Sequence, residues 1–307
     1  MALVKKKTAV IGVGWFGRAH ARVYSGISDL RAVCDTNIEL AKSVSEIYDI
    51  NYYVDYAEML KKEDLDAISV VLPPRVIPLV ARDFANKGID VLLEKPLCVS
   101  INDIKPLMKF TKDVRLSCGF IECFNPVVDR LKKRLAEIGT PIMISSKRIG
   151  RMPKRFWNLG VLLDLGVHEI SVQRRLFGDI VSVKSSLSYF HKEEYEDAAF
   201  LLLEFSNNVK GLIEVNWLTP TKLRKLSVYG SEGILEIDYI TQEIKLTKSS
   251  EDPDFYKIEE SRQPYSWEEP LKRELKGFLY DKENLFPLEE GIKNIEIALQ
   301  CMRKVRG

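Results

Sequence analysis

The sequence is poor in the residues that build metal centres and disulfide frameworks. Its 307 residues include three histidines and five cysteines, and no two cysteines have the Cys-x-x-Cys spacing. Zinc sites usually combine closely spaced Cys and His ligands, and disulfide scaffolds need an even and dense set of cysteines. We therefore expect no metal, no disulfide framework and a reducing compartment.

Long apolar runs and an excess of one charge are also missing. No stretch approaches the roughly 18 apolar residues that cross a bilayer. The 46 Lys and Arg residues nearly balance 44 Asp and Glu residues, for a formal net charge of +2. We therefore expect neither membrane nor nucleic acid as a partner. Lys5–Lys7 precede an apolar stretch, as in a secretory signal, but Arg18 follows soon and no small-residue cleavage site is present. These features predict a cytoplasmic protein.

The first part of the chain alternates between apolar, strand-like segments and amphipathic, helix-like segments. Thr8–Val13 precedes Phe16–Ser25, Leu30–Cys34 precedes Glu39–Tyr48, and Ile89–Leu93 precedes Ile101–Thr111. Such alternation indicates right-handed βαβ units and a parallel sheet that is buried on both faces. Since the length suits two domains, we expect residues 1–120 to form a doubly wound α/β domain.

In the rest of the chain, residues 121–307, strand-like segments follow one another with only turns between them. Ala198–Phe205 and Lys210–Trp217, for example, are separated by the turn signal Ser206–Asn208. This pattern predicts a mostly antiparallel sheet and an α+β second domain. Helical patterns interrupt or follow the strands at Asn125–Ile138, Val161–Phe177 and Leu288–Lys304.

A glycine-rich turn joins the first predicted strand to the first predicted helix. Gly12, Gly14 and Gly17 form a Gly-x-Gly-x-x-Gly pattern that includes Trp15 and Phe16. In this pattern the glycines permit a tight turn, a close approach of a pyrophosphate and close packing of the helix. The backbone N–H groups and the helix dipole then suit phosphates. We therefore predict that this turn binds a dinucleotide cofactor.

An acidic residue follows where ribose recognition requires it. Asp35 ends the second predicted strand, a position from which a carboxylate accepts hydrogen bonds from the adenosine ribose diol. The next residues, Thr36 and Asn37, supply no arginine for a 2′-phosphate. The sequence therefore predicts NAD, not NADP.

The tripeptide Glu94-Lys95-Pro96 lies at the end of the predicted strand Ile89–Leu93. Ligands bind beyond the carboxyl ends of the strands in such sheets. A partly desolvated ammonium there can hydrogen-bond a reacting hydroxyl, although a surface Glu–Lys pair before a turn proline has the same sequence. We assign Glu94 and Lys95, with Pro73 after the predicted strand Asp66–Leu72, to the cofactor site.

Asp164 and His168 lie four residues apart on the predicted helix Val161–Phe177. This spacing places a carboxylate and an imidazole on one helix face. A neutral imidazole can take a hydroxyl proton while the carboxylate orients it. A surface ion pair is the alternative interpretation.

A basic cluster precedes this helix. We predict that Arg148 and Arg151 in this cluster clamp a substrate diphosphate, because arginine forks match phosphate oxygens. A solvated loop is the alternative. The cluster comprises Lys147, Arg148, Arg151, Lys154 and Arg155.

Together these motifs resemble those of the glucose-fructose oxidoreductase and inositol dehydrogenase family. They are the glycine turn continued to His20, the Glu94-Lys95-Pro96 tripeptide and the pair Asp164 and His168. The resemblance spans nearly the whole chain and implies a Rossmann domain followed by a domain with a large open sheet for substrate and subunit contacts. It also implies that Lys95, Asp164 and His168 surround the reacting carbon. His20 we interpret as structural or near the cofactor.

Three further segments are similar to the UDP-N-acetylglucosamine 3-dehydrogenase branch of that family: Phe124–Pro126, Tyr195–Asp197 and Glu214–Lys222. This similarity implies NAD-dependent oxidation of the C3 hydroxyl of a nucleotide sugar. It also implies a homodimer or homotetramer through the C-terminal sheet, since an open sheet needs its second face covered.

The sequence departs from that branch at Pro78, Cys123 and Glu169, where His, Arg and Asp are usual. A free sugar, a polyol or a UDP-hexuronate therefore stays an alternative substrate. A non-catalytic NAD-binding regulator is the alternative of another class, although it would need only the glycine turn and Asp35 and not Lys95, Asp164 and His168.

Overall fold

The computed structural model describes residues 4–153, 158–191, 193–248, 259–262, 267–281 and 284–303. The chain forms two compact units. The first contains the residues up to Phe120 together with Leu271–Lys293, and the second contains Ile121–Pro270 and the residues from Asn294 onward. None of the described helices is both long and apolar enough to span a membrane.

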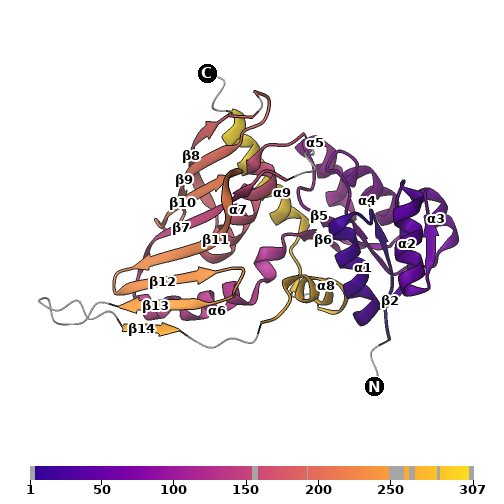
Figure 1. Cartoon of the computed structure of the whole chain (residues 1–307), viewed down its shortest axis with the longest axis horizontal. Helices are drawn as coiled ribbons and strands as arrows, with labels where there is room; N and C mark the ends of the chain where they lie inside the picture. Colours follow the sequence, from indigo (N-terminus) through magenta and orange to yellow (C-terminus); the bar gives the residue numbers. More distant parts are fainter. Residues whose placement is uncertain are drawn as a thin grey trace, which may run out of the picture. The chain divides into compact units, whose positions relative to one another are not determined.

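The first unit is built on a parallel sheet, which in the described residues has six strands in the order β3-β2-β1-β4-β5-β6. All neighbouring pairs in it are parallel, and strand order reverses beside β1, as in the Rossmann fold. Its inner strands are almost entirely buried because helices cover both faces (Figure 1). The strands are β1 (Lys7–Ile11), β2 (Asp29–Cys34), β3 (Asn51–Tyr53), β4 (Ala67–Val70), β5 (Asp90–Glu94) and β6 (Leu116–Gly119).

The helices of this unit begin where the local sequence satisfies their first N–H groups. The side chain of Asn37 accepts hydrogen bonds from the N–H groups of Glu39 and Leu40, and that of Asp55 accepts one from Ala57. The helices are α1 (Trp15–Ile27), α2 (Ile38–Tyr48), α3 (Tyr56–Lys62), α4 (Ile77–Ala85), α5 (Ile101–Ile104), the 3₁₀ helix Lys105–Phe110 and α8 (Pro270–Tyr280).

The late segment Leu271–Lys293 corrects the predicted domain boundary. Residues 121–307 do not all belong to the second unit, because this segment covers β6, the edge strand of the first sheet. The N–H of Cys118 donates to the carbonyl of Phe286 at 2.8 Å, and Arg115 donates to the carbonyl of Leu279 at 2.8 Å. An edge strand leaves backbone groups unpaired, and the returning segment supplies partners that no local sequence signal announces.

The second unit contains a mostly antiparallel sheet, described with eight strands in the order β14-β13-β12-β11-β7-β10-β9-β8. β7 and β10 are its one parallel pair among the described strands. The strands are β7 (Pro141–Arg151), β8 (Ile180–Ser188), β9 (Ala198–Phe205), β10 (Lys210–Asn216), β11 (Leu218–Gly230), β12 (Gly233–Asp238), β13 (Ile244–Lys248) and β14 (Glu259–Arg262). The two sheets confirm the predicted fold class, a Rossmann domain followed by a domain with a large, mostly antiparallel sheet.

Helices pack on the second sheet and position its candidate site. α7 contacts β7 and β10, and α6 contacts β12 and β13 (Figure 1). Alternate side chains of β9 are buried and exposed, so that one face of the sheet packs under helices and the other stays open. The helical elements are the 3₁₀ helix Ile121–Phe124, α6 (Pro126–Arg134), the 3₁₀ helix Leu135–Ile138, the π-helix Leu162–Gly166, α7 (Val167–Phe177) and the part of α9 (Leu288–Arg303) from Asn294 onward.

Candidate active site

Two glycines of the turn between β1 and α1 have no room for a side chain. Gly12 has a φ of +87°, and a Cβ there would lie 2.2 Å from the carbonyl oxygen of Val71. A Cβ on Gly17 would lie 1.8 Å from the carbonyl oxygen of Gly12. Gly14 is the N-cap of α1 and offers no capping side chain. The turn therefore presents backbone N–H groups at a helix N-terminus, the arrangement that fits the phosphates of a dinucleotide.

Asp35 lies beside this turn and is held by the backbone. One carboxylate oxygen accepts a hydrogen bond from Val13 N–H at 2.9 Å, and the other accepts one from Asn37 N–H at 2.9 Å. The side chain is half-exposed. The carboxylate is thus fixed at the carboxyl ends of β1 and β2, where it can accept hydrogen bonds from a ribose diol.

The other predicted cofactor residues lie on the same edge of the sheet or at the start of α1. Trp15 is 83% exposed and its ring stacks on that of half-buried Phe16, with 5.8 Å between centroids. Pro73 follows β4, and its carbonyl accepts a hydrogen bond from Val76 N–H. Lys95 directly follows β5 and is half-buried.

Glu94 points into the first unit, away from the surface. Its side chain is buried, with one oxygen 3.0 Å from His20 Nε2 and the other accepting a hydrogen bond from Lys95 N–H at 3.1 Å. His20 is itself buried, and its Nδ1 lies 3.0 Å from the hydroxyl of Ser69. The surface Glu–Lys pair is therefore excluded. Glu94 instead fixes the backbone at Lys95, and the structural interpretation of His20 fits this network.

In the second unit, His168 lines a cavity of about 280 Å³. The cavity is lined from the helix that carries His168, from the strands β7 and β11, and from Tyr239 and Ile240, which follow β12. Asp164 and Arg151 are not among the residues that line it. Its polar lining residues are Glu122, Asn125, Arg148, His168, Lys222, Arg224 and Tyr239.

The helix that carries Asp164 and His168 begins with a π-turn. Residues Leu162–Gly166 form this π-helix, and α7 continues from Val167. The sequence predicted a uniform α-helix, so this geometry was missed. The wider turn still keeps Asp164 roughly one turn ahead of His168, and such π-turns are frequent at functional sites.

Glu196 anchors this π-turn. The sequence did not identify Glu196 as a site residue. Its carboxylate accepts a hydrogen bond from Leu162 N–H at 3.0 Å, and its carbonyl accepts one from Val161 N–H at 2.9 Å. A Cβ on Gly160 would lie 2.0 Å from the Glu196 carboxyl group. Burial raises the pKa of Glu196. The one sequence feature that pointed to Glu196 was the similarity of the segment Tyr195–Asp197 to the dehydrogenase branch.

Arg148 lies in a buried ionic network beneath the cavity. It pairs with Glu122 at 2.9 Å and with Glu169, and its guanidinium lies over the ring of Tyr239 at 5.2 Å. The Tyr239 hydroxyl donates to Glu169 at 3.1 Å. Burial alone would lower the pKa of Arg148, but the two carboxylates outweigh burial and raise it. Glu169, a departure from the related branch, thus has a defined role beside His168.

The first three residues of the basic cluster lie in a strand and not in the solvated loop that is the alternative interpretation. Pairing with β10 and β11 extends β7 through Lys147 and Arg148 to Arg151. Lys147 pairs with Glu214 at 2.8 Å on the open face of the sheet, and Arg151 is exposed at the end of the strand. The last two cluster residues, Lys154 and Arg155, lie outside the described residues.

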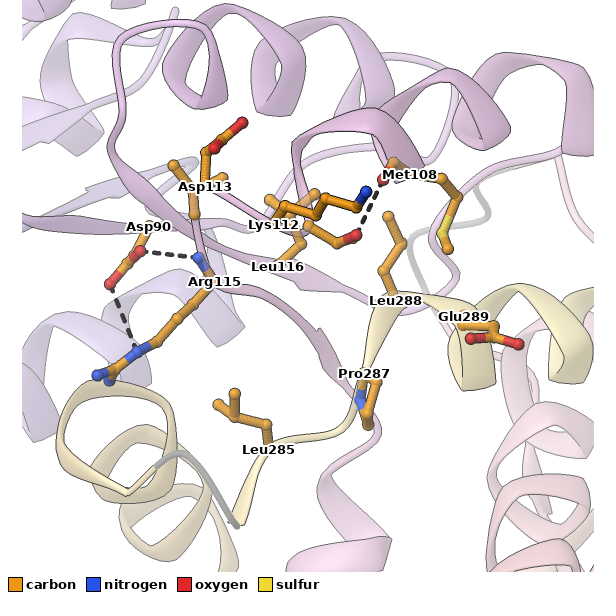
Figure 2. Close-up of a pocket in the computed structure, with 12 residues that line it drawn as sticks. Asp90, Met108, Lys112, Asp113, Arg115, Leu116, Leu285, Pro287, Leu288 and Glu289 are labelled. Carbon is orange, nitrogen blue, oxygen red and sulfur yellow. Dashed lines mark hydrogen bonds and ion pairs between the residues drawn. The ribbon is translucent and has the colours of Figure 1, made fainter.

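A second cavity, of about 500 Å³, lies at the opposite edge of the first sheet. It adjoins the amino ends of β5 and β6, where Asp90 and Arg115 bond to each other (Figure 2). Ligands of such sheets bind at the carboxyl ends of the strands. We therefore do not place the active site here.

Comparisons with known proteins identify the family of both units. A model of the oxidoreductase family with an NAD-binding Rossmann fold matches residues 6–120, and a GFO/IDH/MocA C-terminal domain model matches residues 128–236. UDP-N-acetylglucosamine 3-dehydrogenase of Acidithiobacillus ferrooxidans is 23% identical over 80% of this chain and 77% of its own. Scyllo-inositol 2-dehydrogenase of Bacillus subtilis is 27% identical over 75% of this chain and 73% of its own.

A solved structure of the Acidithiobacillus ferrooxidans enzyme superposes with a TM-score of 0.86 at 22% identity, covering 97% of each chain. At this identity the structural likeness establishes the shared fold. The family models cover the glycine turn of the first unit and the helix of His168 in the second. The chain is thus an oxidoreductase of the Gfo/Idh/MocA family, whose members act on CH–OH groups with a nicotinamide cofactor.

Proposed function

We propose that the protein is an NAD-dependent dehydrogenase that oxidises a secondary hydroxyl, at C3, of a UDP-sugar such as UDP-N-acetylglucosamine. The observation that carries this proposal is the cavity in which His168 lies beside the cations Lys222 and Arg224, while a third cation, Arg148, is balanced by Glu122 and Glu169. A neutral polyol needs no such positive lining, whereas a nucleotide sugar carries a diphosphate. The relative from Acidithiobacillus ferrooxidans supports the same substrate class.

The proposed chemistry divides among three side chains. His168 takes the proton of the reacting hydroxyl, Lys95 hydrogen-bonds the same oxygen and stabilises its developing negative charge, and Asp164 orients the imidazole. When bound, NAD supplies the hydride acceptor. Lys95 suits this role because the buried Glu94 holds its backbone at the end of β5.

The first unit would hold NAD through backbone and side-chain groups already described. The N–H groups of the turn Gly12–Gly17 would meet the pyrophosphate, and Asp35 would accept hydrogen bonds from the ribose diol. Trp15, Phe16, Pro73 and Lys95 would border the rest of the dinucleotide, while the buried Glu94 would act by holding the backbone of Lys95. A carboxylate at position 35 also repels a 2′-phosphate. These features support NAD over NADP.

The test is reduction of the cofactor in the presence of candidate substrates. We expect UDP-N-acetylglucosamine to reduce NAD, with NADP a poorer acceptor. Free N-acetylglucosamine, scyllo-inositol and UDP-glucuronate serve as comparison substrates. Turnover of the inositol or the free sugar alone would replace the UDP-sugar assignment with a polyol or sugar dehydrogenase. NAD binding without turnover of any alcohol would favour a regulatory role.

A further inference from the structure

The three cations of the cavity are not equivalent. Arg148 and Arg224 are register partners on the adjacent strands β7 and β11, so they lie side by side on the same face of the sheet. Arg148 is compensated by Glu122 and Glu169. Its guanidinium is already committed to protein carboxylates, and it is poorly suited to bind a substrate anion.

Arg224 has a different environment. It is half-buried, and its Nη1 donates hydrogen bonds to the carbonyl oxygens of Ile149 and Leu223. Within the described residues no carboxylate lies within ion-pair distance of Arg224 or of exposed Lys222. A partly buried guanidinium without a counter-ion is costly, and an anionic ligand would relieve that cost.

The titration behaviour of Arg224 agrees with this description. Burial, followed by the neighbouring charge of Arg148, lowers the pKa of Arg224 to about 10. Glu122, Glu169 and Asp164 act in the opposite direction without restoring the ordinary value. The side chain therefore remains charged near neutral pH while being incompletely compensated.

The donors that remain on Arg224 have a defined geometry. Because both of its hydrogen bonds to the protein leave from Nη1, the edge formed by Nε–H and Nη2–H keeps its donors for a ligand. That edge presents two parallel N–H groups, which match two oxygens of one phosphate or carboxylate. Lys222, two residues earlier on β11, lines the same cavity and adds a mobile point charge.

From these observations we propose that Arg224, assisted by Lys222, binds the diphosphate of the substrate, and that Arg148 is a supporting residue. This inference rests on the proposed function and narrows it, because it requires an anionic substrate and moves the diphosphate site from the predicted cluster of β7 to β11. The carboxylate of a hexuronate can also accept hydrogen bonds from Arg224. The experiment therefore distinguishes a diphosphate ligand from a carboxylate ligand.

The experiment measures UDP binding by calorimetry for the wild type, Arg224→Gln, Lys222→Gln and Lys225→Gln. Lys225 is a matched control because it is the next residue of β11, is exposed, and is the register partner of Lys147 on the other face. Loss of a bidentate charged contact should weaken UDP binding about 10- to 100-fold in Arg224→Gln. We expect a smaller loss, roughly 3- to 10-fold, in Lys222→Gln. Lys225→Gln should change binding by less than about twofold.

One further variant and one further ligand complete the experiment. Arg224→Lys keeps the charge but loses the fork, and should give an intermediate loss if Arg224→Gln does not fold. Glucuronate binding that depends on Arg224 while UDP binding does not would assign the site to a carboxylate and overturn the proposal. Equal UDP affinity in Arg224→Gln and Lys225→Gln would overturn it too.

Failure of this inference is distinguishable from failure of the proposed function. If UDP binding depends on Arg224 but no alcohol reduces NAD, the diphosphate site stands and the dehydrogenase proposal fails. If a neutral polyol reduces NAD equally well in the wild type and in Arg224→Gln, and UDP does not bind, the dehydrogenase stands and the diphosphate site fails.

Discussion

Asp35 is the side chain on which cofactor choice should depend. Its carboxylate is fixed by two backbone N–H groups, so it meets the ribose with little freedom to move aside for a 2′-phosphate. We expect Asp35→Asn, which keeps an acceptor for Val13 N–H, to reduce the preference for NAD over NADP by about 1 to 3 kcal/mol. The measurement is the ratio of the two dissociation constants. A ratio equal to that of the wild type would remove Asp35 from ribose recognition.

His168 and Lys95 should share one catalytic role at the reacting oxygen. General-base catalysis contributes roughly 10²- to 10⁴-fold, so His168→Ala should lower kcat by about that factor while NAD affinity stays constant. Lys95→Ala should be comparably damaging. Since both side chains are proposed to contact the same oxygen, the double variant should lose less than the product of the single losses.

The pH profile of His168→Ala shows whether His168 or Lys95 is the general base. A variant with nearly normal kcat from about pH 6 to 9 would identify Lys95 as the base and leave His168 to position the substrate. Steady-state rates and NAD titrations on the same preparations supply both quantities.

At the scale of elements, the sequence predicted what local patterns encode. Periodicity and the glycine turn were enough for the strands from β1 to β6 except β3, a short three-residue strand. The helix expected at 101–111 is instead α5 followed by a 3₁₀ turn that contains Pro106, which has no N–H to donate. α3 and α8 were missed.

The candidate site was predictable where chemistry resides in a motif and not where it depends on pairing between distant strands. Motifs were enough to name Lys95 and His168 as candidates, and their catalytic roles stay predictions. Arg224 was not, because only the register of β11 against β7 places it beside Arg148. The π-turn before α7 was missed for a similar reason, since its anchor Glu196 comes from a separate part of the chain.

The role of Glu196 as the anchor of the π-turn can be tested through the stability of the protein. Glu196→Ala should leave the buried N–H of Leu162 without its side-chain acceptor and lower the free energy of unfolding by about 1 to 3 kcal/mol. Glu196→Gln keeps an amide oxygen that can accept the same hydrogen bond and should cost less. Chemical denaturation of the wild type and both variants gives the comparison. Equal losses in both variants would show that the hydrogen bond does not anchor the turn.

The same carboxyl group predicts a pH dependence. Because burial raises the pKa of Glu196 in the folded protein, the folded state holds this proton more tightly than the unfolded state. The stability from Glu196 is therefore fully present below the unfolded pKa and is lost as pH rises through the folded pKa. The stability of Glu196→Gln relative to the wild type should accordingly increase with pH across that window. An unchanged difference would mean that the carboxyl group does not titrate with folding.

At the scale of the whole molecule, the open face of the second sheet exposes apolar side chains. Phe200 and Leu202 project from β9 and are 44% and 58% exposed. Their register partners on β10 are Glu214 and Leu212, so apolar side chains from two strands lie next to each other on this face. Exposed apolar side chains grouped on a sheet face are typical of an interface between subunits. This supports a homodimer or homotetramer formed through the second sheet.

We therefore expect the protein to have the mass of a dimer or tetramer in solution, and Phe200→Glu with Leu202→Glu to shift it toward monomer. Two buried carboxylates facing their copies across a symmetric interface would lack partners, and association should weaken by several kcal/mol. Ile47→Glu is the matched control, because Ile47 is 65% exposed on α2 of the first unit. Light scattering coupled to gel filtration measures the mass. An oligomer that survives both β9 substitutions would place the interface elsewhere, since a sheet-to-sheet contact cannot bury those charges without losing affinity.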